Sequence, residues 1–98
     1  MEQKKIEKIC RRALDTWGKT YQLSMVLEEM AELQIELLKN MNRDKNNIDK
    51  IAEECADVEV VLNYVKLHFG IKDEVEKYVE FKVNRLEKRL NEWEEENK

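Results

Sequence analysis

The sequence of 98 residues, with a mass of 11.8 kDa, is long enough for a single domain over residues 1–98. Proline is absent, only two glycines occur and 41% of the residues are charged, which excludes collagen-like, β-rich and flexible-linker proteins. The net charge of −4 lacks the basic excess of most nucleic-acid-binding proteins. No stretch is long and apolar enough for a membrane span, and the polar N-terminus has no signal-peptide core. We therefore expect a cytoplasmic, all-α protein that binds neither nucleic acid nor membrane.

Apolar residues recur at steps of three and four residues along four segments, and each segment is predicted to form a helix. The first runs from Ile6 to about Trp17 and ends near Gly18. Thr20 is placed to cap the second, which covers about residues 21–40. The apolar face of this second helix is wider than a single seam, so the helix needs more than one neighbour.

The third and fourth predicted helices have distinct end signals. Asn47 ends a polar loop and is placed to cap the third helix, and Gly70 fits a left-handed cap at its other end. Asp73 and Glu76 resemble a capping box at the start of the fourth helix. Short connections favour an antiparallel helical bundle of about four helices. Because a chain of this length has a thin core, we expect oligomerisation to complete the bundle.

Cysteine and histidine offer little chemistry in this sequence. Cys10 and Cys55 fall within helical apolar patterns and lack the spacing of a metal site, so we interpret both as reduced core thiols. His68 is the only histidine, which excludes zinc sites of the HExxH kind and di-iron bundles with two ExxH motifs. Any catalysis must therefore rely on carboxylates.

Acidic residues flank the apolar stripes of the second and third helices. Winding at about 100° per residue places Glu29 and Glu32 along one flank of the second helix. It leaves Glu54 partly buried on the third helix, with Asp57 just beyond it. Four carboxylates around one small volume require protonation or a shared cation, and oxygen ligands alone select magnesium, manganese or calcium. The alternative is that these acids are solvated surface charges.

A basic row flanks the apolar stripe of the fourth helix and consists of Lys82, Arg85 and Arg89. Such a row either pairs with surface acids or binds phosphates, and Lys82 and Arg85 are the better candidates for phosphate. Three aromatic residues either stack on a base or belong to the core, namely Trp17, Tyr21 and Tyr64.

Two segments together resemble the MazG-like all-α nucleoside triphosphate pyrophosphohydrolases. Residues 17–33 contain an EExxE motif at 28–32, and residues 52–70 contain an ExxD motif that begins at Glu54, with 21 residues between the motifs. The segment 82–90 is similar to the closing helix of that family. The resemblance covers nearly all of the chain beyond the first dozen residues.

This resemblance implies magnesium-dependent hydrolysis of a nucleoside triphosphate to a monophosphate and pyrophosphate, with manganese as a possible substitute. It also implies a homodimer or homotetramer whose sites draw on more than one chain. By position, the metal ligands are Glu29, Glu32, Glu54 and Asp57. The accessory acids are Glu28 and Glu53, and the phosphate-contacting residues are Lys82 and Arg85. The expected base and ribose contacts are Trp17 and Gln22.

Two other interpretations stay open on the sequence alone. The first is a non-catalytic helical dimerisation or adaptor protein, in which the acids are surface charges. The second is a module that binds nucleotide and metal without turnover. A magnesium-dependent rise in melting temperature separates the adaptor from the other two, because only a metal-binding native state is stabilised by the ion.

Overall fold

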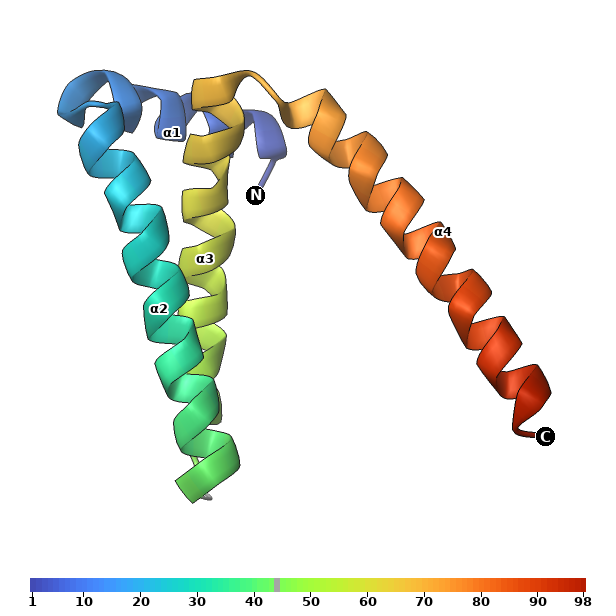
Figure 1. Ribbon diagram of the computed structural model, residues 1–98. Helices are drawn as coiled ribbons and strands as arrows, with labels where there is room; N and C mark the ends of the chain where they lie inside the picture. The colour runs from blue at the N-terminus through green and yellow to red at the C-terminus, as the bar shows by residue number, and fades with distance from the viewer. Residues whose placement is uncertain (44) are drawn as a thin grey trace.

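The computed structural model describes residues 1–43 and 45–98, and these residues form four α-helices and no strand (Figure 1). The helices are α1 (Gln3–Trp17), α2 (Lys19–Arg43), α3 (Ile48–Phe69) and α4 (Lys72–Glu96). The all-α prediction and the number of helices are therefore confirmed. Within the described part of the chain, none of the helices has the length and apolarity needed to cross a membrane.

Helices α2 and α3 form an antiparallel hairpin, and α1 lies across the end where α2 begins and α3 finishes (Figure 1). The buried apolar core between these three helices is small and consists of Cys10, Leu14, Val26 and Val61. Polar groups share this interior, so the hairpin is held by more than apolar packing.

The turn between α1 and α2 depends on Gly18, whose φ of 90° is a conformation that residues with a Cβ rarely adopt. Helix α2 begins directly after it at Lys19, and the Gly18 carbonyl accepts a hydrogen bond of 3.2 Å from the Gln22 amide. The prediction that Thr20 caps α2 is wrong, because the helix has already started one residue earlier.

Asn47 occupies the predicted position directly before α3, but its side chain does not cap the helix. The Asn47 amide group instead donates to the Glu36 backbone carbonyl at 2.9 Å and to Glu36 Oε1 at 3.0 Å. Asn40 Nδ2 donates to Asn47 Oδ1 at 3.2 Å. Asn47 therefore ties the start of α3 to the last turns of α2, which fixes how the two helices align.

Gly70 adopts the predicted left-handed conformation at the end of α3, with a φ of 63°. Helix α4 then begins at Lys72, so the predicted capping box at Asp73 and Glu76 is wrong and both acids lie inside the helix. The ion pair between Lys72 Nζ and Glu7 Oε1, at 2.9 Å, joins the start of α4 to α1.

Beyond its first turns α4 leads away from the hairpin, and no residue of this helix is buried (Figure 1). Its apolar stripe is exposed over Val79, Val83, Leu86, Leu90 and Trp93. The predicted antiparallel packing therefore holds for α2 and α3, whereas the fourth helix does not close the bundle within one chain.

The two cysteines have different environments, although both were expected in the core. Cys10 is buried and free, and its burial raises the pKa of the thiol. Cys55 is exposed, so that half of the prediction is wrong. The reason is the rotation of α3, which turns Glu54 and Val61 inward and leaves the Cys55 side of the stripe uncovered.

Candidate metal centre

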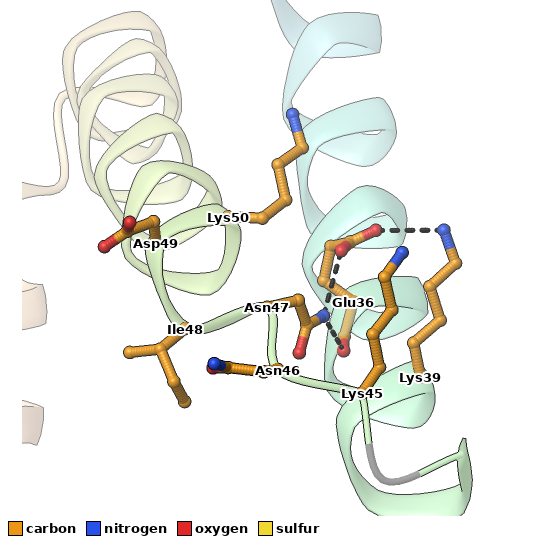
Figure 2. A pocket seen from close by; sticks show the side chains of 8 residues that line it. All are labelled: Glu36, Lys39, Lys45, Asn46, Asn47, Ile48, Asp49 and Lys50. Carbon is orange, nitrogen blue, oxygen red and sulfur yellow. Dashed lines mark hydrogen bonds and ion pairs between the residues drawn. The ribbon is translucent and has the colours of Figure 1, made fainter.

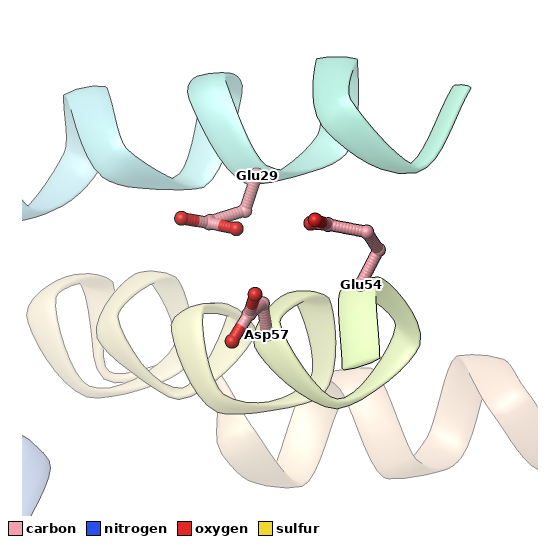
Figure 3. Close-up of side chains that lie close together, drawn as sticks. All are labelled: Glu29, Glu54 and Asp57. Carbon is pink, nitrogen blue, oxygen red and sulfur yellow. The ribbon is translucent and has the colours of Figure 1, made fainter. Parts of the chain in front are cut away.

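Three carboxylates from two helices meet between α2 and α3 (Figure 3). Glu29 comes from α2, and Glu54 and Asp57 lie one turn apart on α3, so the two helices present their acids to the same space. One ligand oxygen from each residue lies within 4.8 Å of the others. The convergence that the sequence predicts is therefore present for three of the four proposed ligands.

The burial of these carboxylates distinguishes them from ordinary surface acids. Glu54 is only 3% exposed and Glu29 is half-buried. Among the described residues, neither Glu54 Oε2 nor Glu29 Oε2 has a hydrogen-bond partner, and both atoms are buried. Buried carboxylate oxygens without donors are costly. Their positions suit a divalent cation that prefers oxygen ligands, such as magnesium or manganese.

The pKa of the Glu29 carboxyl is raised from its ordinary value of 4.5 to about 7. Burial is the largest cause, and the negative charges of Glu32, Asp57 and Glu54 add to it. Near neutral pH the centre therefore binds a proton where a cation is absent, which is the behaviour expected of crowded acids.

Lys50 supplies part of the positive charge that the cluster needs, and this residue was not predicted. Its Nζ lies 3.2 Å from Glu54 Oε1 and 3.7 Å from Glu53 Oε1. The hydrogen bond with Glu54, followed by the charge of Glu53, raises the pKa of Lys50. The sequence carried a signal for this pair, since Lys50 precedes Glu54 by four residues on one helix.

The remaining predicted acids lie at the edge of the cluster. Glu32 follows Glu29 by one turn on α2 and is exposed, so it acts on Glu29 through its charge rather than as a fourth converging group. Glu28 and Glu53 are also exposed.

Within one chain the structure does not bring the predicted phosphate-binding residues to the acids. Lys82 and Arg85 lie on the exposed part of α4, which leads away from the hairpin (Figure 1). The Arg85 guanidinium instead sits 5.7 Å from the centre of the Phe81 ring, a cation–π distance.

The two residues predicted to contact the base and ribose differ in exposure. Trp17 is 66% exposed and forms, with Tyr21, a shallow apolar pocket of about 210 Å³ beside the α1–α2 turn. Gln22 is 3% exposed and belongs to the interior of the bundle, where it lies near Tyr64. Its Oε1 atom has no partner among the described residues.

Comparison of the chain with protein-family models, with curated proteins and with solved structures gave no match.

Proposed function

We propose that the chain is a magnesium-dependent nucleoside triphosphate pyrophosphohydrolase of the MazG-like kind, which converts a nucleoside triphosphate to the monophosphate and pyrophosphate. The observation that carries this proposal is the meeting of Glu29, Glu54 and Asp57 within 4.8 Å, with buried oxygens that lack partners. The motif spacing in the sequence adds to it, because both motifs contribute to the same cluster.

The chain's own residues divide the work of binding the ion. Glu54 and Asp57 offer oxygens from one helix and Glu29 from the other, so an ion held between them also joins α2 to α3. Glu32, one turn further along α2, is exposed and adds negative charge at the edge of this set without converging on it. When bound, magnesium would supply positive charge to the phosphate oxygens and lower the pKa of an attacking water.

The other predicted residues act on protons, phosphates and the base. Glu28 and Glu53 are exposed beside the cluster and are available to accept a proton from water. Lys82 and Arg85 bind phosphate oxygens through charge-assisted hydrogen bonds. Trp17 provides an exposed aromatic face on which a base can stack, whereas Gln22 lies in the interior, where its Oε1 has no partner among the described residues.

A homo-oligomer is part of this proposal. The exposed apolar stripe of α4 requires a partner, and the exposed Leu27, Leu38 and Met41 on α2 offer apolar surface to cover. If α4 of a second copy packs against the hairpin, Lys82 and Arg85 reach the acids from the neighbouring chain. A homodimer satisfies this requirement, and a homotetramer is an assembly of two such dimers.

The exposed α4 also favours a second candidate function, a non-catalytic helical dimerisation or adaptor protein. An unpartnered amphipathic helix is a common docking element, and it needs no metal. Magnesium raises the melting temperature only if the acidic cluster binds the ion, so a melting temperature that magnesium leaves unchanged favours the adaptor.

Turnover in oxygen-18 water tests the proposed reaction. Canonical and modified ribo- and deoxynucleoside triphosphates are incubated with the protein and magnesium, and the products are separated by chromatography. We expect pyrophosphate as the first product and the label on the monophosphate, because attack occurs at the α-phosphorus.

The inactive comparison is Glu54→Gln, which removes the negative charge of one buried carboxylate while keeping the shape of the side chain. It should lose activity by at least about a hundredfold. Orthophosphate as the first product, or label in the pyrophosphate, would show that a different bond is cut. Nucleotide binding without products would indicate the binding module.

A further inference from the structure

A pocket lies at the end of the hairpin where α2 passes into α3 (Figure 2). It has a volume of about 630 Å³ and is open to solvent. Its described lining comes from the last turns of α2, the connection and the first turn of α3. The proposed hydrolase function assigns no role to this pocket.

Three lysines line the pocket, although the whole chain carries a net charge of −4. The amino groups of Lys39, Lys45 and Lys50 all lie toward α2, whereas the carboxylate of Asp49 points away from them (Figure 2). Positive charge is therefore concentrated on one side of the pocket.

The acid on that side, Glu36, is already compensated. Asn47 Nδ2 donates to Glu36 Oε1 at 3.0 Å, and Lys39 Nζ lies 3.2 Å from Oε2. These contacts lower the pKa of Glu36, with the bond from Asn47 as the larger cause, so the carboxylate is ionised and held in place. Glu36 thus positions Lys39 at the pocket. Lys45 also lines the pocket, and Lys50 lines it while pairing with Glu54.

The pocket also lies on the start of a long helix. Its lining includes Ile48, Asp49 and Lys50, the first turn of the 22-residue α3. Asn47 does not cap this turn, because its Oδ1, the atom that could accept a hydrogen bond from the helix amides, accepts one from Asn40 Nδ2 at 3.2 Å. The positive end of the helix dipole therefore adds to the lysine charges.

Lys50 connects this pocket with the metal centre. The same side chain lines the pocket and pairs with Glu54 Oε1 at 3.2 Å. A ligand that spans both places would need one part that binds a divalent cation and another that is anionic. Phosphate chains have this chemistry.

We propose that this lysine pocket, defined by Lys39, Lys45, Lys50 and the first turn of α3, binds the phosphate groups of a polyphosphate ligand. Binding of the anion stands on the pocket's own charges. The assignment of that anion to the phosphates of the substrate rests on the proposed hydrolase function.

The test uses inorganic pyrophosphate and the full-length protein freed of metal with EDTA. Titration is followed by isothermal calorimetry and by the NMR shifts of backbone amides. We expect the amides of Ile48, Asp49 and Lys50 to shift, and Lys45→Gln to weaken binding at least about fivefold. Lys77→Gln is the matched control, since it removes the same charge from exposed α4, and it should bind pyrophosphate as the parent does.

Two results would overturn the proposal that the pocket binds phosphate. One is that the NMR signals of the amides in the first turn of α3 do not shift, and the other is that Lys45→Gln and Lys77→Gln weaken pyrophosphate binding equally. Circular dichroism shows that each variant is folded, and Lys45→Arg should retain binding. Neither readout depends on turnover, so failure of the pocket and failure of the hydrolase are separate results.

A second titration identifies the source of the anion. Pyrophosphate is added to the protein in the presence of magnesium and a non-hydrolysable nucleoside triphosphate analogue. Competition between the two supports a pocket that holds the substrate's phosphates. Simultaneous binding refutes that assignment and identifies a separate site for free pyrophosphate or a similar anion.

Discussion

Replacing Glu29 with glutamine should make the metal-free protein more stable above neutral pH. The side chain keeps its shape but loses a negative charge from a space shared with Glu54 and Asp57. Glu29 has a pKa raised from 4.5 to about 7, so the protein binds a proton on folding. The stability that this carboxyl contributes is fully present below pH 4.5 and is lost as the pH rises through about 7.

The size of the effect follows from the pKa of Glu29. A rise from 4.5 to about 7 corresponds to about 3 kcal/mol if the whole shift acts on stability. The side chain is only half-buried, so solvent screening reduces the expected gain to roughly 1–2 kcal/mol. Glu29→Gln should therefore exceed the parent by that amount at about pH 8.5 and match it at about pH 4.5.

Urea unfolding at fixed protein concentration with EDTA measures this difference at both pH values. Groups far from the cluster act equally in the two proteins, so the difference reports Glu29 and its interaction with the neighbouring acids. Glu28→Gln, next to it but exposed, is the control and should change stability by less than about 0.5 kcal/mol. A Glu29→Gln protein that is less stable than the parent at about pH 8.5 would refute the crowding of acids. Magnesium should reverse the order, because only the parent keeps all of its carboxylate ligands.

Three further outcomes follow from the same contacts. Glu54→Gln should bind magnesium more weakly than the parent by at least about tenfold in calorimetry with a nucleotide analogue, and unchanged affinity would mean that the ligand set is misassigned. Asn47→Ala should lower the free energy of unfolding by about 1–3 kcal/mol, because Glu36 loses two hydrogen bonds, whereas exposed Asn46→Ala should be nearly neutral. In sedimentation at micromolar concentration the parent should form an oligomer, and a folded species near 11.8 kDa would contradict the proposed assembly.

The sequence predicts the helices well because apolar periodicity and glycine conformation are local properties. Gly70 ends α3 as expected, and α3 starts directly after Asn47. The predicted caps of α2 and α4 failed for a common reason. Gly18 and Ile71 supply backbone carbonyls to the first turns, so both helices begin before the polar side chains that were expected to cap them.

The sequence predicts those features of the candidate site that depend on a single helix. The spacing of Glu54 and Asp57 places them one turn apart, and their position beside an apolar stripe indicates burial. The rotation of α2 relative to α3 is not contained in either pattern. That rotation turns Glu29 toward the cluster and leaves Glu32 exposed, and it also leaves Cys55 outside the core.

The position of α4 links the assembly to the proposed chemistry. Lys82 and Arg85 lie on a helix that leaves its own hairpin, and the only ion pair that ties α4 to α1 within the described chain is at its first residue, Lys72. Lys50 of α3 pairs with Glu54 and also lines the lysine pocket, so one chain already brings positive charge to one side of the cluster. A phosphate chain bound there would still present its other side to solvent. Packing of a neighbouring α4 against the hairpin would cover that side with basic residues and bury the apolar stripe in the same step, so the same contact would complete both the core and the site.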